Sequence, residues 1–164
     1  WLLVLMISAT ASSMIITAFE DALAAQVALT AFIPMLMNTG GNSGSQASVT
    51  IIRGLSLNEI QYKDFFKVLW KEIRVGVLCG VTLAAANYVK LLLLDRVSFL
   101  IAAAVCLTLV LTVILSKIVG ALLPMGAKKI GLDPAVMASP FISTIVDILS
   151  LLVYFQIATL LLGL

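Results

Sequence analysis

The chain has 164 residues, of which 62% are hydrophobic and 11% are charged, and its formal net charge is +2. A soluble domain is about one-quarter charged, so this composition excludes an ordinary soluble protein and predicts an all-α membrane protein. The sequence has no histidine, which excludes His-based acid–base catalysis and His-ligated metal sites. We expect neither an enzyme nor a nucleic-acid partner.

Five apolar segments follow one another along the chain, and a membrane-spanning helix needs about 20 such residues. We therefore predict five transmembrane helices in a single domain, residues 1–164. The chain enters an apolar run directly at Trp1 without a basic leader, as expected of a piece of a longer protein rather than of a signal peptide. The predicted spans are residues 2–19, 22–52, 75–94, 97–125 and 135–164.

The first segment is rich in small and hydroxyl-bearing residues, which allow helices to approach closely in lipid. We interpret these residues as packing residues. They are Ser8, Thr10, Ser12, Ser13 and Thr17.

The second segment contains the polar stretch PMLMNTGGNSGSQ, residues 34–46. Pro34 removes a helical N–H group and the glycines weaken helix propensity. Non-helical backbone survives inside a membrane only where it is buried in protein or lines a wet cavity. We therefore expect loosened backbone here, lining an ion path, with side-chain oxygens from Asn38, Asn42 and Gln46 and a continuation of the polar face at Thr50. The alternative is a kinked helix whose small residues pack against a neighbour.

The long connection after the second segment carries an amphipathic pattern. Ser56 and Glu59 fit a capping box, and the aromatic and basic residues that follow occupy opposite helical faces. This pattern predicts an interfacial helix that contacts membrane lipid. Basic residues concentrate in this connection and in the one that contains Lys128 and Lys129, which places both on the cytoplasmic side. The N-terminus is then cytoplasmic and the C-terminus external.

Two ionisable residues stand inside the later spans. We expect Lys117 to reach the membrane interface with its long side chain. Asp147 lies midway along the fifth span, where an ionised carboxylate is costly and commonly functional. Ser143, Thr144, Ser150 and Tyr154 share its helical face. The alternatives for Asp147 are a protonated carboxyl group bonded to Ser or Thr, or an ion pair with Lys117.

Two cysteines and an aspartate have structural interpretations. Cys79 and Cys106 lie alone in apolar runs, so we expect small buried residues rather than a redox pair. Asp133 precedes Pro134 and fits the N-cap of the fifth span.

Oxygen atoms and one carboxylate, with no nitrogen or sulfur cluster, favour a hard cation. Mg²⁺ prefers oxygen and keeps much of its water. Ca²⁺ ordinarily takes more carboxylates and Zn²⁺ takes His or Cys. The type of ligand alone does not exclude K⁺ or Na⁺. A two-fold axis that brings two Asp147 carboxylates together would suit a divalent ion and supports a homodimer.

The opening WLLVL, the stretch PMLMNTGGNSGSQ and the stretch LLPMGAKKIGLDPAVMASPFISTIVDILSLLVYF resemble the transmembrane domain of the MgtE family of bacterial magnesium channels. The resemblance implies five transmembrane helices, a homodimer with its pore on the two-fold axis, and a hydrated Mg²⁺ ion as substrate. It also implies an inner (plasma) membrane location. The acidic pore residue falls on Asp147, its neighbour one turn earlier on Ser143, and the second-helix lining on Asn42 with the backbone at Gly40 and Gly41.

The family also has cytosolic regulatory regions, an N domain and CBS domains, which are absent from this sequence. If the chain is expressed without them, we expect feedback closure by cytosolic Mg²⁺ to be weakened or absent. A cation-coupled carrier using H⁺ or Na⁺, a membrane assembly subunit, and passage of Mn²⁺, Co²⁺ or Ni²⁺ are the open alternatives.

Overall fold

The computed structural model describes residues 2–163, except for the side chains of residues 4 and 135–140. Its regular elements in the described residues are all helical, which confirms the predicted all-α class. The elements are α1 (Leu2–Ala18), α2 (Glu20–Ala25), η1 (Val27–Phe32), α3 (Ile33–Ser56), η2 (Tyr62–Asp64), α4 (Phe65–Leu93), α5 (Phe99–Lys129) and α6 (Pro134–Leu162).

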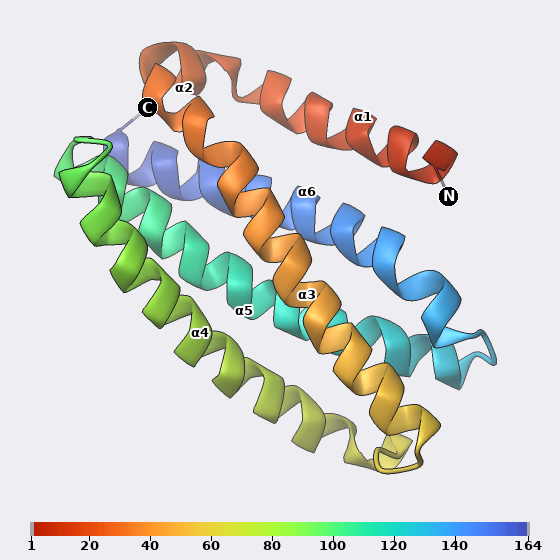
Figure 1. The fold of residues 1–164 in the computed structure, drawn as a ribbon. Helices are drawn as coiled ribbons and strands as arrows, with labels where there is room; N and C mark the ends of the chain where they lie inside the picture. Colours follow the sequence, from red (N-terminus) through yellow and green to blue (C-terminus); the bar gives the residue numbers. More distant parts are fainter. Residues whose placement is uncertain (1, 164) are drawn as a thin grey trace.

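The connections between the long helices alternate between two ends of the bundle (Figure 1). The start of α1 lies at the same end as the α3–α4 and α5–α6 connections, whereas α2, the α4–α5 connection and the end of α6 lie at the other. Among the described residues, three helices are long and apolar enough to cross a membrane: Tyr62–Leu93, Phe99–Lys129 and Phe141–Leu162. Helices of this length and composition are expected in a membrane protein. That the chain crosses the membrane five times remains a prediction.

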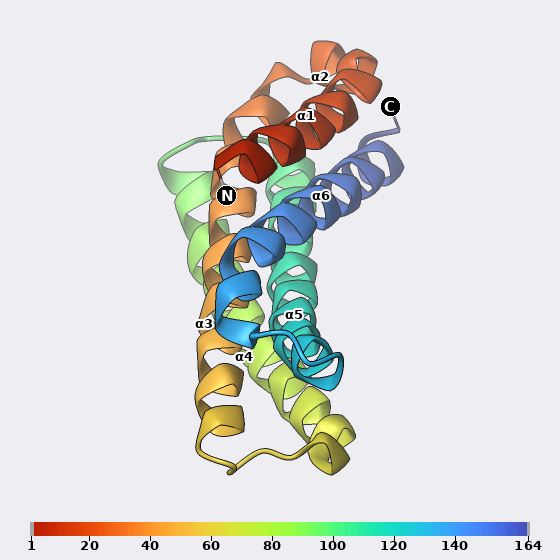
Figure 2. The ribbon, with the colours of Figure 1, turned by 90° about the vertical axis from the view of Figure 1, so that its right-hand side faces the viewer.

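Helix α5 lies at the centre of the bundle and packs against α3, α4 and α6. Helix α1 packs chiefly against α6 and lies to one side (Figure 2). The rings of Phe19, at the end of α1, and Phe155, on α6, stack with centroids 4.7 Å apart. The largest side chains of the main core include Leu29, Leu36, Leu91, Leu151 and Tyr154.

Helix α3 differs from the prediction of loosened backbone because it runs as an α-helix through the whole polar stretch. Pro34 stands in its first turn, where a missing N–H group breaks no helical bond. The chain departs from α-helical geometry earlier, at Gln26 (φ −139°, ψ 78°) and the 3₁₀ turns of η1. The buried hydroxyl group of Tyr154 donates to the Leu29 carbonyl oxygen at 2.8 Å, which satisfies one backbone group of η1.

Helix α4 combines two predicted elements, the interfacial helix and the third span. The amphipathic stretch and the third span form one 29-residue helix, about 44 Å long at 1.5 Å per residue. No glycine or proline stands between residues 65 and 75 to divide them. The predicted Ser56–Glu59 capping box is wrong, because Ser56 is the last residue of α3 and its hydroxyl group bonds the Ile52 carbonyl. The capping box lies instead at Gln61 and Asp64.

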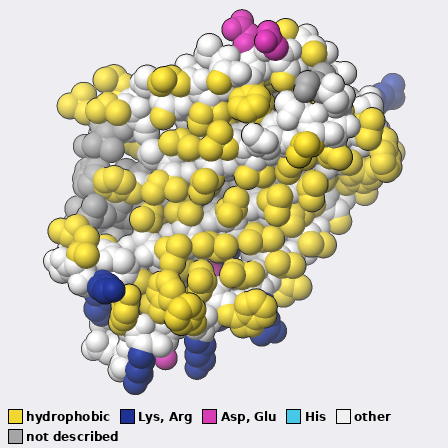
Figure 3. Space-filling view, turned by 180° about the vertical axis from the view of Figure 1, so that it is seen from behind, with side chains coloured by type: hydrophobic (Ala, Val, Ile, Leu, Met, Phe, Trp, Pro, Cys, Tyr) yellow, Lys and Arg dark blue, Asp and Glu magenta, His cyan; other side chains and the backbone are white. Residues whose placement is uncertain are grey.

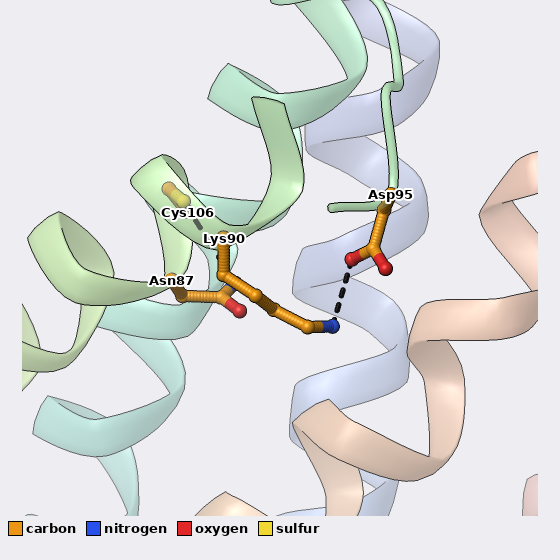
Figure 4. A network of polar contacts seen from close by, with 4 residues as sticks. All are labelled: Asn87, Lys90, Asp95 and Cys106. Atoms are coloured by element: carbon orange, nitrogen blue, oxygen red, sulfur yellow. Dashed lines mark hydrogen bonds and ion pairs between the residues drawn. The ribbon is translucent and has the colours of Figure 1, made fainter. Parts of the chain in front are cut away.

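The α4–α5 hairpin is closed by a few polar contacts (Figure 4). Lys90 and Asp95 form an ion pair with Nζ and Oδ2 2.7 Å apart. The Cys106 thiol donates to the Ala84 carbonyl oxygen at 3.4 Å, so Cys106 is buried as expected. Cys79 is exposed, contrary to the expectation, because it lies on the outward face of α4.

The rear surface of the bundle is broadly hydrophobic (Figure 3). In this view most Lys and Arg side chains lie at the lower end, and the largest group of acidic atoms lies at the top. An apolar band between two polar ends is what a bilayer requires of a protein surface.

Candidate ion site

A groove of about 560 Å³ runs between α3 and α6. Asp147 and Ser143 on α6 face it from one side. Helix α3 borders it with one helical face, apolar near its start and polar from Asn38 onward, because residues three and four apart share a face. The α3 residues that line the groove are Ile33, Pro34, Met37, Asn38, Gly41, Asn42 and Ser45.

The two asparagines of the groove are joined to each other. The Asn42 amide nitrogen donates to the Asn38 side-chain oxygen at 3.1 Å. This bond fixes the relative orientation of the two amides and leaves the Asn42 side-chain oxygen without a protein donor among the described residues. The α3 wall of the groove therefore presents oxygen atoms that can accept hydrogen bonds from water.

A second hollow, of about 370 Å³, adjoins Asp147 between α1 and α6. Ser143, Thr144 and Asp147 line it from α6. Helix α1 contributes three hydroxyl-bearing residues, Ser8, Ser12 and Ser13. These serines were expected only to pack against a neighbouring helix, although the i, i+4 spacing of Ser8 and Ser12 indicates a common helical face.

Asp147 makes no hydrogen bond or ion pair with another described residue. Among those residues the ion pair Lys90–Asp95 stands alone, so the alternative of an Asp147–Lys117 pair is wrong. Lys117 is only 8% exposed and lies at the α4–α5 interface, where its Cγ atom is 3.4 Å from a Cβ placed on Gly76. It does not reach toward the groove.

The remaining predicted residues lie in three places: the second hollow, the exposed surface of α3 beyond the groove, and the protein interior. Thr144 lines the second hollow. Gln46 and Thr50 are exposed one and two turns beyond Asn42, and the Thr50 hydroxyl group donates to the Gln46 carbonyl at 3.0 Å. Gly40 does not line the groove, because a Cβ there would lie 2.7 Å from methyl groups of Thr112 and Val146.

The predicted polar face of the fifth span is also divided. Ser150 and Tyr154 are buried, and the Ser150 hydroxyl group donates to the Val146 carbonyl oxygen at 2.6 Å. These two side chains stabilise the interior of the bundle. Only the first part of the face, from Ser143 to Asp147, is open to the groove.

The groove suits a cation that keeps its water. Within the described residues, no three His, Cys, Asp or Glu side chains come together to form a cage for a bare ion. One carboxylate with several amide and hydroxyl groups provides charge and hydrogen-bond acceptors for bound water. That set of ligands is typical of Mg²⁺, which loses its water reluctantly.

Comparison with known proteins decides the family. Residues 33–157, from the start of α3 into α6, match the sequence pattern of MgtE, described as a divalent cation transporter. The chain belongs to the MgtE family. The function of that family is transport, in agreement with the expectation that the chain is not an enzyme.

Individual MgtE proteins match nearly the whole chain. The magnesium transporter MgtE of Thermus thermophilus is 37% identical over 166 residues, which cover 99% of this chain and 36% of that protein. The magnesium transporter MgtE of Bacillus subtilis is 37% identical over 163 residues, 97% of this chain and 35% of that protein. The chain therefore spans about a third of the length of these relatives.

Proposed function

We propose that this chain forms the transmembrane ion path of an MgtE magnesium transporter and that Mg²⁺ passes through the groove at Asp147. Magnesium is the ion named for the two relatives above. The observation that carries the proposal is the Asp147 carboxylate. It has no protein partner among the described residues and faces a groove lined with amide and hydroxyl groups.

The energetics of the carboxylate favour a cation in the groove. An ionised carboxylate inside a membrane is costly unless it has a partner or faces water. Asp147 is only partly buried and has no basic neighbour within ion-pair distance in the described part of the chain. A passing divalent ion supplies the missing positive charge, so the site attracts the ion that it conducts.

The size of the groove favours a hydrated ion. Six water molecules at about 30 Å³ each occupy about 180 Å³, and the groove measures about 560 Å³. The asparagine and serine side chains then contact the water shell rather than the ion. Such contacts distinguish Mg²⁺ from ions that shed water more readily.

The polar face of α3 supports a homodimer with its pore on the two-fold axis. Asn38, Asn42, Gln46 and Thr50 are all exposed in the single chain, and polar groups at membrane depth are normally covered by protein or face water. A second copy across a two-fold axis would cover this face and bring a second Asp147 to the same path.

The membrane potential is a sufficient driving force in this proposal. An inside-negative potential contributes about 2.3 kcal/mol per charge per 100 mV, and twice that for a divalent ion. Basic residues at the end of α3, in η2 and at the end of α5 lie together at one end of the bundle, which we propose is the cytoplasmic side. Five crossings, a cytoplasmic N-terminus and an external C-terminus follow from this arrangement.

The test is Mg²⁺ uptake by purified protein in liposomes under an imposed inside-negative potential. We expect uptake to rise with the potential and to need neither a pH gradient nor a Na⁺ gradient. Uptake that stops when either gradient is removed would favour a coupled carrier. No uptake by the wild-type chain at any potential would contradict the proposed function.

A further inference from the structure

A recess far from the ion groove lies where the end of α3, the 57–61 connection and the end of α5 meet. Its volume is about 330 Å³. We call it the basic recess, because two lysines, Lys128 and Lys129, stand at its wall. The full lining is Leu55, Asn58, Ile60, Gln61, Tyr62, Met125, Lys128 and Lys129.

Three contacts hold the walls of the basic recess in place. The Lys128 ammonium group donates to the Leu55 carbonyl oxygen at 2.8 Å and so joins α5 to α3. The Ile60 amide donates to the Gly54 carbonyl oxygen at 3.0 Å, which folds the connection back over α3. The Gln61 amide donates to the Asp64 carboxylate at 3.0 Å. The recess therefore exists before any ligand arrives, which lowers the entropy cost of binding.

The positive charge of the basic recess is not neutralised by the protein. Neither lysine forms an ion pair with a carboxylate of the described residues. The Lys129 ammonium group lies 4.9 Å from the centroid of the Tyr62 ring, which orients it without cancelling its charge. The Asn58 and Gln61 side chains add amide groups that can donate hydrogen bonds.

We propose that the basic recess binds the phosphate group of an anionic phospholipid. Two ammonium groups and neighbouring amides are suitable donors for a phosphodiester. The recess lies at the end of the bundle where Arg53, Lys63 and Lys67 also stand. A basic pocket at the cytoplasmic membrane surface is a known way to recognise acidic lipid head groups.

The surroundings of the basic recess favour a lipid over a free phosphate ion. Phe66 and Trp70 on α4 follow Tyr62 of η2 at intervals of four residues and are 80% and 63% exposed. Aromatic side chains of this kind sit at the level of lipid head groups. A phospholipid whose phosphate group lies in the recess would then place its acyl chains along the apolar surface of the helices. This site does not depend on the ion path, and its test does not use transport.

The test is native mass spectrometry of the detergent-solubilised chain with phosphatidylglycerol, compared with phosphatidylcholine. We expect phosphatidylglycerol to bind more tightly. Lys129→Gln removes one recess charge and should weaken that binding about fivefold, which corresponds to about 1 kcal/mol. Asn58→Gly removes the amide while it keeps the left-handed backbone of residue 58 (φ 57°) and should weaken binding as well.

The matched control is Lys67→Gln, which removes the same charge from the same end of the bundle but outside the basic recess. It should leave the affinity within about twofold of the wild type, as expected for a well-exposed surface charge. Equal losses in Lys67→Gln and Lys129→Gln would overturn the proposal in favour of a diffuse basic surface. Equal binding of the two lipids, or displacement of phosphatidylglycerol by millimolar inorganic phosphate, would also overturn it.

Discussion

The polar stretch of α3 has different surroundings on the two faces of the helix. One face carries Asn38, Gly41 and Asn42 and opens onto the groove with Asp147. The opposite face carries Gly40 and Gly44, which lie against α5 and α6. The helix is continuous through both, so the same stretch of α3 supplies groove-facing amides on one side and close helix packing on the other.

This difference shows how a helix can carry a polar stretch and keep its backbone hydrogen bonds. The backbone groups are satisfied within the helix itself, and only side chains face the groove. The glycines do not loosen the helix but bring it close to α5, where a Cβ on Gly120 would overlap the Gly44 carbonyl oxygen. Close packing of α3 fixes the position of its groove face relative to Asp147.

The largest expected effect on folding is that of Gly120→Ala. The added methyl group meets the Gly44 backbone oxygen, which cannot rotate away, so overpacking should cost about 1–3 kcal/mol or more. The protein is heated in detergent and the fraction that stays folded is measured by size-exclusion chromatography, which gives the unfolding midpoint. Gly126→Ala is the matched control, because nothing lies within 4 Å of its Cβ. Equal unfolding midpoints for the two variants would show that the α3–α5 contact is not tight.

Asn42→Ala tests the other face of α3. It removes the amide that bonds Asn38 and borders the groove. We expect Mg²⁺ uptake to fall about tenfold, which is the size of effect seen when a residue that hydrogen-bonds to a metal's ligands is removed. The unfolding midpoint should change little because Asn42 is exposed. A large loss of stability with unchanged uptake per folded molecule would reverse the roles assigned to the two faces.

The smallest expected effect is that of Thr112→Val on the packing side. The Thr112 methyl group lies against Gly40 of α3, and the buried hydroxyl oxygen has no hydrogen-bond partner among the described residues. Valine keeps the shape and removes the unpaired group, so stability should rise by about 1 kcal/mol with uptake unchanged. The unfolding midpoint and liposome uptake measure the two quantities. A fall in uptake would assign the hydroxyl group to the ion path.

The sequence predicts the helical class and the acidic residue of the groove better than it predicts backbone detail. Hydrophobic segment length locates the first, fourth and fifth spans within a few residues. The second predicted span, residues 22–52, is instead divided among α2, η1 and α3, and the third joins the preceding amphipathic stretch into α4. Gly40 and Pro34 suggest a broken helix because propensity describes an isolated chain, whereas packing against α5 and α6 stabilises α3.

Part of the groove depends on contacts between distant residues. The α1 serines face Asp147 across more than 130 positions of sequence, and no local pattern distinguishes that contact from ordinary helix packing. Likewise, the helical face of Asp147 extends in sequence to Tyr154, but packing against η1 buries its far end. Side-chain type therefore indicates candidates, and tertiary packing selects among them.

The most direct test compares two acidic side chains, both on long helices. Asp147 faces the groove, whereas Glu72 is 6% exposed on α4 and lines neither hollow beside Asp147. Asp147→Asn and Glu72→Gln each remove one negative charge and keep the size of the side chain. Potential-driven Mg²⁺ uptake in liposomes should collapse in Asp147→Asn and stay near the wild-type rate in Glu72→Gln. Normal uptake by folded Asp147→Asn would contradict the claim that the ion passes Asp147.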